Sequence, residues 1–262
     1  MQRNITFKNS KGQRLVGVLH IPKGSPLDAT RGEAGSGPFP AVIVQHGLSS
    51  DHSDKLVAAI CRKLERKQII AFRFTYSGHK PSQGGYNDVL ISQFVKDVRQ
   101  GVRFLTNLKQ ADKNHLGLIG HSMGGFASLV TASKFFNDIK AVVTISCFFD
   151  IDGLLRKNQY KKNIIIGKKY FTMWGLKVSA KHFQDKIYHD RKKNIQNIHC
   201  PALIVHGAND ETVEVKDCHK IYNLLKQPKQ LIIIKNGDHN FTKEKPFNQA
   251  VDLSVEWMKK YL

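Results

Sequence analysis

The chain has 262 residues, of which 41% are hydrophobic, so it can bury a sizeable core and is not an intrinsically disordered protein. Lysine and arginine number 41 against 21 aspartates and glutamates, and the resulting formal charge of +20 concerns solubility and attraction to anions rather than the fold. The polar N-terminal stretch and the lack of any apolar run near ~18 residues predict neither a secretory signal nor a transmembrane segment.

Short apolar runs alternate with longer amphipathic stretches along the chain. The runs that predict strands are 5–7, 15–21, 41–45, 69–74, 115–119, 141–145, 201–205 and 231–234. Helices are predicted between or after them, with apolar side chains at three- and four-residue spacing, at 51–66, 88–108, 123–136, 213–225 and 247–262. Short apolar strands separated by helices are typical of an α/β protein with a mostly parallel sheet covered on both faces.

One segment breaks this alternation. About 55 residues separate the apolar runs 141–145 and 201–205 without a clear strand of the sheet, which is long for a simple connection. We expect residues 148–197 to form an inserted, mainly helical cap on a core made of 1–147 and 198–262. Its aromatic residues either pack the cap onto the core or line an acyl or aryl pocket; they are Phe148, Phe149, Tyr160, Tyr170, Phe171, Trp174, Phe183 and Tyr188.

Cysteine use and charge bear on compartment and partners. The four cysteines are scattered without a C-x-x-C pair, which is typical of reduced thiols in a cytoplasmic protein and predicts neither a disulfide framework nor a zinc site. The lysines are dispersed and belong to no recognisable nucleic-acid module, so we do not expect nucleic acid as a partner. Residues 148–200 carry twelve Lys/Arg against four Asp/Glu; this face is either solvated or attracts anionic substrates, an acidic partner or a lipid surface.

The sequence L-I-G-H-S-M-G-G-F at 118–126 places Ser122 between an apolar strand and a helix-like stretch. A G-x-S-x-G motif in this context is typical of a nucleophile elbow, a sharp turn that exposes the serine hydroxyl at the N-terminus of a helix. Gly120 and Gly124 provide the space that such a turn needs. Read without its flanking elements, the same pattern also fits a plain turn or a helix N-cap.

A serine hydroxyl needs a base, and the base needs an orienting carboxylate. Asp210 follows the strand 201–205 in H-G-A-N-D, and His239 follows the next strand in K-N-G-D-H-N-F. Because the carboxyl ends of parallel strands converge at one edge of a sheet, we expect Ser122, Asp210 and His239 to form a catalytic triad.

Several neighbours compete for these roles. Glu211 is the alternative to Asp210, whereas Asp217 lies within the following helix, where we expect it in solvent. Asp238 is expected to shape its loop. Three other histidines stand beside glycines at strand ends and are expected to be structural; they are His46, His121 and His206.

An oxyanion hole requires backbone N–H donors next to the nucleophile. One donor is expected from Met123, directly after the serine, and the other from the loop Q-H-G-L-S-S at 45–50, through Leu48. Gly47 lets that backbone approach the nucleophile closely.

These motifs together resemble the α/β-hydrolase superfamily: H-G-L-S-S, G-H-K-P-S-Q-G-G, G-H-S-M-G-G, H-G-A-N-D and G-D-H-N-F. Within it the chain is similar to serine esterases of the feruloyl/cinnamoyl esterase and monoacylglycerol lipase type. The resemblance implies an eight-stranded, mostly parallel sheet, a cap over the active site, and hydrolysis of carboxylic esters by Ser122, Asp210 and His239. One departure is Arg73, where many relatives carry an acidic residue near the end of the fourth strand.

The sequence therefore predicts a serine carboxylesterase for small to medium acyl or aryl esters, which needs neither a metal nor an organic cofactor. Acyl-thioesterase and monoacylglycerol-type lipase activities use the same residues and stay open. A non-catalytic ligand-binding protein on the same scaffold is the alternative from another class.

Overall fold

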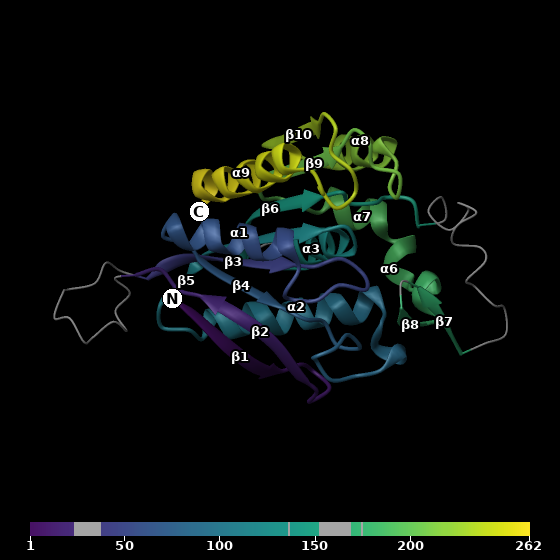
Figure 1. Ribbon diagram of the computed structural model, residues 1–262, viewed down its shortest axis with the longest axis horizontal. Helices are drawn as coiled ribbons and strands as arrows, with labels where there is room; N and C mark the ends of the chain where they lie inside the picture. The colour runs from purple at the N-terminus through teal and green to yellow at the C-terminus, as the bar shows by residue number, and fades with distance from the viewer. Residues whose placement is uncertain (24–37, 136, 152–168, 174) are drawn as a thin grey trace.

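The computed structural model describes residues 1–23, 38–135, 137–151, 169–173 and 175–262 (Figure 1). Its centre is an eight-stranded sheet in the order β1-β2-β4-β3-β5-β6-β9-β10. The strands are β1 (Gln2–Lys8), β2 (Arg14–His20), β3 (Phe39–Gln45), β4 (Ile70–Phe74), β5 (Ala111–His121), β6 (Ile139–Ile145), β9 (Ala202–Gly207) and β10 (Lys229–Ile234). β1 and β2 are antiparallel to their neighbours, and all pairs from β4 to β10 are parallel. The predicted α/β-hydrolase architecture is confirmed.

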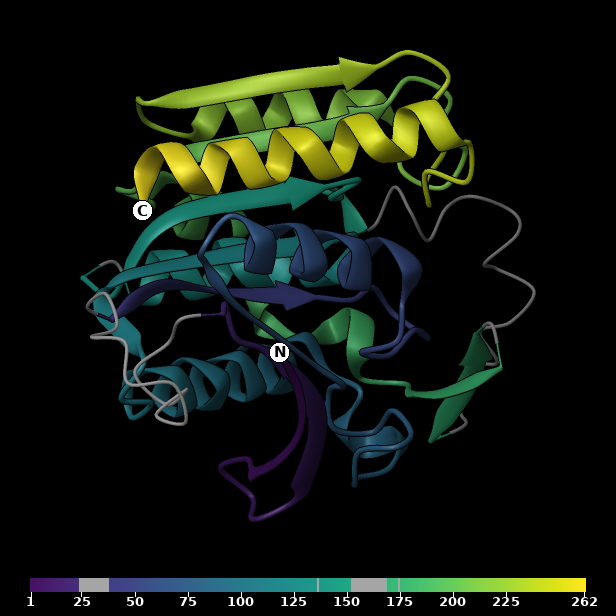
Figure 2. The same ribbon diagram turned by 60° about the vertical axis from the view of Figure 1, so that its left-hand side comes forward.

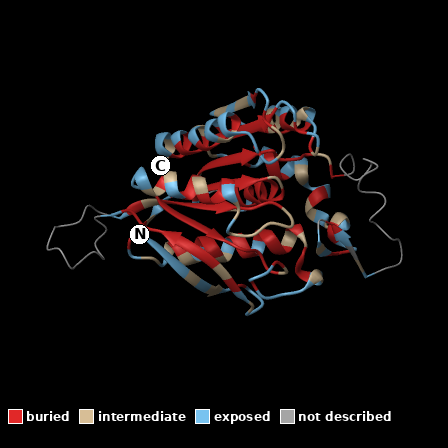
Figure 3. Cartoon of the chain, viewed as in Figure 1, coloured by how far each residue is buried: buried red, intermediate tan, exposed pale blue. Residues whose placement is uncertain are grey.

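Helices cover both faces of this sheet, as Figure 2 shows. The long helices are α1 (Lys55–Arg66), α2 (Ile91–Thr106), α3 (Met123–Lys134), α8 (Val215–Leu224) and α9 (Glu244–Tyr261). The apolar sides of α1 and α9 form one core with the sheet, and those of α2, α3 and α8 form the other. The central strands are buried on both sides (Figure 3), which explains why their sequences are apolar runs rather than alternating patterns.

The described part of 148–197 lies beyond the carboxyl ends of the parallel strands, to the right in Figure 1. It contains β7 (Tyr170–Met173), β8 (Leu176–Ser179), the 3-10 helix η2 (His182–Gln184), α6 (Lys186–His189) and α7 (Arg191–Gln196). The sequence showed no strand here, but β7 and β8 form a separate antiparallel pair. Gly175 at φ +78° lies between them, in a conformation that glycine adopts without steric cost.

Aromatic side chains of this segment pack onto the core. Phe148 stacks on Phe126 of α3 with ring centroids 5.1 Å apart, and Tyr188 lies 5.4 Å from the same ring. Phe148 and Tyr188 are buried, so they serve packing as one of the two sequence interpretations had it. Tyr160 and Trp174 lie outside the described residues.

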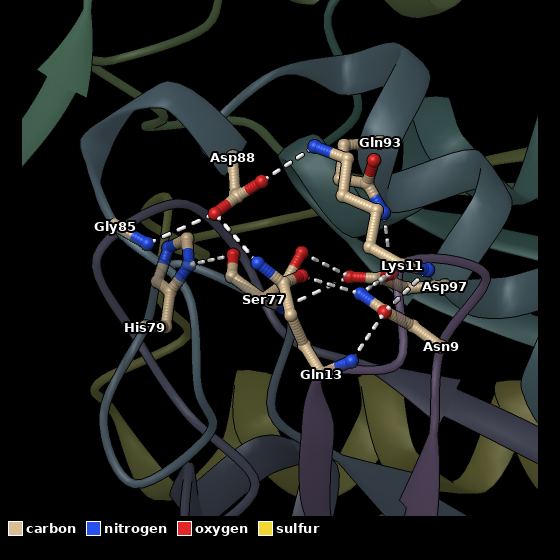
Figure 4. A network of polar contacts seen from close by, with 9 residues as sticks. All are labelled: Asn9, Lys11, Gln13, Ser77, His79, Gly85, Asp88, Gln93 and Asp97. Carbon is tan, nitrogen blue, oxygen red and sulfur yellow. Dashed lines mark hydrogen bonds and ion pairs between the residues drawn. The ribbon is translucent and has the colours of Figure 1, made fainter.

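Two carboxylates fasten the loop between β4 and α2 (Figure 4). Asp97 is fully buried and accepts four hydrogen bonds, from Asn9 Nδ2 (3.0 Å), Gln93 Nε2 (2.8 Å), Ser77 N (2.8 Å) and Ser77 Oγ (2.7 Å). Asp88, in the 3-10 helix η1 (Tyr86–Asp88), accepts hydrogen bonds from Lys11, Gln13 and Gly85. Because these donors come from the β1–β2 hairpin and from both ends of the loop, the loop is tied to the sheet near the ends of its strands.

Within the ranges that the structure describes, no helix combines the length and the apolar character needed to cross a membrane. All four cysteines are free thiols; Cys61, Cys147 and Cys218 are buried and Cys200 is partly buried. The structure therefore buries three of the four thiols.

His182 joins the segment 148–197 to the body. It is fully buried, donates from Nδ1 to the carbonyl of Val89 (2.8 Å) and accepts the hydroxyl of Tyr188 at Nε2 (3.1 Å). Burial lowers the pKa of His182 to about 4, despite the bond to Val89.

We predict that His182→Asn makes the stability less sensitive to pH. The folded pKa of about 4 lies below the ordinary 6.5, so between these values the unfolded chain binds more protons and the free energy of unfolding falls with falling pH. One such histidine contributes at most about 1.4 kcal/mol per pH unit in this window. Urea unfolding of both proteins at several pH values inside the window measures the slope. A variant with the wild-type slope would contradict the prediction.

Candidate active site

Ser122 occupies a strained turn between β5 and α3. Its φ of +52° and ψ of −115° lie outside the regions that a serine ordinarily adopts. Two close approaches make the turn possible. A Cβ at Gly120 would lie 2.2 Å from the carbonyl oxygen of Gly124, and a Cβ at Gly124 would lie 2.5 Å from that of His46. The N–H of Ser122 donates to Ile145 (2.8 Å), so the turn is also tied to the end of β6.

The imidazole of His239 lies between Ser122 and Asp210. Its Nε2 is 3.1 Å from Ser122 Oγ and its Nδ1 is 2.8 Å from Asp210 Oδ2. Ser122 follows β5, Asp210 follows β9 and His239 follows β10, so the three loops meet at the carboxyl edge of the sheet. The structure thus brings together all three residues of the predicted triad.

Asp210 is held as a carboxylate by donors on both oxygens. Oδ1 accepts the N–H groups of Thr212 (2.9 Å) and Val213 (2.8 Å), and Oδ2 faces His239. Burial opposes the charge, but the hydrogen bond and charge of His239 and the Val213 N–H outweigh it and lower the pKa of Asp210 below its ordinary value. An ionised Asp210 requires the proton of His239 to sit on Nδ1, which leaves Nε2 free to accept from Ser122.

His206 is a second imidazole at Asp210. It is fully buried, and its Nε2 lies 3.3 Å from Asp210 Oδ2 and 3.1 Å from the carbonyl of Val213. Since both partners are acceptors, Nε2 carries the proton. Burial lowers the pKa of His206, so this residue supports the carboxylate as a neutral donor.

The competing acids lie elsewhere. Asp217 was expected in solvent, but this is wrong: it is 5% exposed, and its Oδ2 accepts the N–H groups of Phe149 and Asp150, both at 3.0 Å. Unpaired N–H groups at the start of the segment 148–197 explain why a carboxylate is buried there. Asp238 accepts from the backbone and side chain of Thr242, as expected of a residue that shapes its loop.

The loop after β3 approaches the nucleophile as the sequence predicted. A Cβ at Gly47 would lie 3.3 Å from Ser122 Cβ, so only glycine allows this approach without displacement. His46 Nδ1 donates to the Gly47 carbonyl (2.7 Å), and the N–H of Ser49 donates to His79 Nε2 (3.3 Å). These bonds hold the loop that carries Leu48, a residue that lines the same cavity as Ser122. Met123, the other expected donor, begins α3, and the first N–H groups of a helix have no partner within it.

Arg73 has a structural role that the sequence did not show. Its side chain is 7% exposed, donates from Nε to His20 Nε2 (3.0 Å) and donates from Nη1 to the carbonyl of His52. His52 in turn donates its N–H to Thr75 Oγ1 (3.0 Å). The arginine at this departure from the α/β-hydrolase pattern therefore ties the end of the β3 loop to β4.

A cavity of about 340 Å³ opens in front of the nucleophile. Its lining mixes polar and apolar surface and consists of Gly47, Leu48, Ser49, Ser50, Asp54, His121, Ser122, Thr212, His239 and Asn240. A second cavity of about 290 Å³ adjoins it over the first turns of α1 and α9, and the two share Asp54, His121 and Asn240. The residues described as lining these two cavities thus place hydroxyl, amide and carboxylate groups near Ser122 and His239.

Two further side chains contact the main chain of His239; His121 was expected to be structural, whereas Ser146 was missed by sequence reasoning. His121 Nε2 lies 2.8 Å from the backbone carbonyl oxygen of His239, and Ser146 Oγ donates to the same atom at 3.0 Å. The position of His121 directly before the nucleophile could have signalled its role. Nothing in the sequence around Ser146 points to this contact, which depends on how the ends of β6 and β10 meet.

The model of the prolyl oligopeptidase family matches residues 87–262, which is more than half of the chain. The chain belongs to the prolyl oligopeptidase family. Over 249 residues it is 26% identical to the uncharacterized protein YfhR of Salmonella typhi, covering 90% of this chain and 74% of that protein.

Other proteins to which this prolyl oligopeptidase family member is similar include esterases. It is 26% identical over 167 residues to the acetyl esterase Axe7A of Xylanibacter ruminicola, which covers 64% of this chain and 35% of that protein. Its fold matches Est1E of Butyrivibrio proteoclasticus, solved with ferulic acid bound, with a TM-score of 0.80, 18% identity and 98% of both chains covered. The expected resemblance to α/β-hydrolases of the feruloyl esterase type is confirmed.

We predict that Gly124→Ala lowers kcat/KM by about 10²-fold or more, because the added Cβ must displace either α3 or the end of β3 and a shift near 1 Å misplaces the nucleophile. Ester hydrolysis and the circular dichroism spectrum measure the effect and the retention of the fold. Gly85→Ala is the matched control, since a Cβ there meets nothing within 4 Å and its φ is −138°. Equal activity of the two variants would show that the close packing at Gly124 does not position Ser122.

Proposed function

We propose that this protein is a serine carboxylesterase that hydrolyses small to medium acyl or aryl esters through an acyl-enzyme. The observation that supports it most is the chain of contacts from Ser122 Oγ to His239 Nε2 (3.1 Å) and from His239 Nδ1 to Asp210 (2.8 Å). Each residue has the partner that its role requires, in the tautomer that its neighbours dictate.

In the first step Ser122 Oγ attacks the acyl carbon while its proton passes to His239 Nε2. The imidazolium that forms is stabilised by Asp210, whose lowered pKa keeps it ionised. His239 then returns the proton to the leaving alcohol as the carbon–oxygen bond breaks. Water attacks the acyl-enzyme by the same route, and the acid is released.

Negative charge develops on the carbonyl oxygen of the ester during both steps. We assign its stabilisation to the N–H groups of Leu48 and Met123, one from the β3 loop and one from the first turn of α3. A donor of this kind lowers the barrier by about 3 kcal/mol because it is already oriented when the charge forms. The positive end of the α3 dipole acts in the same direction.

The substrate class follows from the cleft and the relatives. Short acyl groups fit a 340 Å³ cavity whose described lining mixes polar and apolar surface, and Axe7A is an acetyl esterase. Est1E, whose fold is similar, was solved with an aromatic acid bound. We propose that residues 148–197 act as a cap over this cleft, since their described part lies at the carboxyl edge of the sheet (Figure 1).

Membership of the prolyl oligopeptidase family favours a second candidate, cleavage of a peptide or anilide bond by the same acyl transfer. The residues would be the same, and the difference would lie in the leaving group, because an amine is a poorer leaving group than an alcohol and depends more strongly on protonation by His239. Turnover of esters, thioesters and anilides with one common acyl group separates these activities. A faster anilide reaction than ester reaction would overturn the carboxylesterase proposal.

We predict that Ser122→Ala removes nearly all turnover while the fold is retained, and that Asp210→Asn lowers kcat by about 10⁴-fold because it favours the wrong tautomer of His239. Both are measured as kcat on the best ester of a panel graded in acyl length. Fluorophosphonate labelling of wild type, located at Ser122 by peptide mass, tests the non-catalytic alternative. A Ser122→Ala protein that keeps more than a few per cent of wild-type turnover would contradict the proposal.

A further inference from the structure

The backbone carbonyl oxygen of His239 accepts two side-chain hydrogen bonds. One comes from His121 Nε2 (2.8 Å) and the other from Ser146 Oγ (3.0 Å). His239, whose ring contacts Ser122, is therefore also held through its own backbone carbonyl.

The donor on His121 is fixed by its surroundings. The side chain is buried, and burial together with the neighbouring His239 lowers the pKa of His121 to about 4. A neutral imidazole has one N–H, and since Nε2 faces a carbonyl oxygen, that nitrogen carries it. His121 is thus a neutral, oriented donor that adds no positive charge beside the imidazolium of the catalytic cycle.

Both donors are anchored on the nucleophile's side of the site. His121 immediately precedes Ser122, whose N–H is bound by Ile145. Ser146 immediately follows Ile145, has a φ of +50°, and its N–H donates to Val205 (2.9 Å). The ends of β5, β6 and β9 are therefore hydrogen-bonded to one another. Together they carry the two side chains that donate to the carbonyl oxygen of His239.

The other bonds of the loop that carries His239 lead elsewhere. Within the part of the chain that the structure describes, they run inside the loop, as from Phe241 N to Asp238, or to the β9 loop, as from Asn209 N to Gly237 (2.8 Å). Apart from the catalytic bond itself, the bonds to His121 and Ser146 are what tie this loop to the strand ends next to the nucleophile.

We propose that His121 and Ser146 are positioning residues that set the distance between His239 and Ser122. The proposal rests on the proposed function only in the identity of the nucleophile and base. Ser146 is the cleaner probe of the two, because it is fully buried and does not line the cleft, whereas His121 does. Loss of either donor should slow every reaction that needs activated Ser122.

The test measures the second-order rate constant of fluorophosphonate labelling at Ser122, and kcat and KM for an ester per labelled site. Ser146→Ala removes only the hydroxyl, and His121→Phe keeps an aromatic ring without a donor. Each should react about 10- to 10²-fold more slowly. For Ser146→Ala the loss should appear in kcat with KM unchanged. His121→Gln, whose amide N–H can reach the same carbonyl, should recover most of the rate.

Each outcome decides the question. A purely structural role would lower the unfolding midpoint and the labelled fraction but not the rate per labelled site. Labelling of Ser146→Ala and His121→Phe within about twofold of wild type would overturn the proposal. Labelling needs no ester, so it tests the positioning independently of the esterase function. A wild type that is labelled at Ser122 but hydrolyses none of the esters would refute the esterase function, while the two variants would still test the positioning. A wild type that is not labelled would refute both proposals.

Discussion

The site depends on one steric constraint, the positive φ of Ser122 where β5 turns into α3. The turn lifts Oγ away from the sheet toward His239 and directs the first N–H groups of α3 to the same side. Two contacts hold the turn in this conformation. Gly120 and Gly124 are in backbone contact across it, and the carbonyl of Ile145 at the end of β6 accepts the N–H of Ser122. Strain of this kind costs on the order of 1–3 kcal/mol and is retained where the surrounding structure over-determines it.

Buried neutral histidines are the recurring means by which the loops around this turn are held. His46, His121 and His206 each place one N–H on a main-chain carbonyl of a loop at the site. Burial lowers the pKa of each, so the imidazoles act as hydrogen-bonding groups rather than as charges. In the proposed mechanism this leaves Asp210 to stabilise the positive charge that forms on His239 during acyl transfer.

The strong positive charge of the chain does not extend to the described wall of the cleft. That lining contains one carboxylate, Asp54, and neither lysine nor arginine. Asp54 also caps α1 by accepting the N–H groups of Leu56 and Val57. That the basic residues of 148–200 attract anions therefore stays a prediction. It is separate from the chemistry at Ser122, because none of these residues is among those described as lining the cleft.

The sequence by itself determined what is local. Apolar runs and helical spacing located the strands and long helices, and G-x-S-x-G identified the turn, because backbone sterics act over a few residues. The expected convergence of parallel strand ends also predicted that His239 meets Ser122 across 117 residues, although the 3.1 Å contact itself is a property of the fold. Tertiary structure alone decided that Asp217 is buried against Phe149 and that Ser146 reaches the His239 carbonyl. These contacts follow from strand order and from how loop ends pack, so no pattern within a short window specifies them.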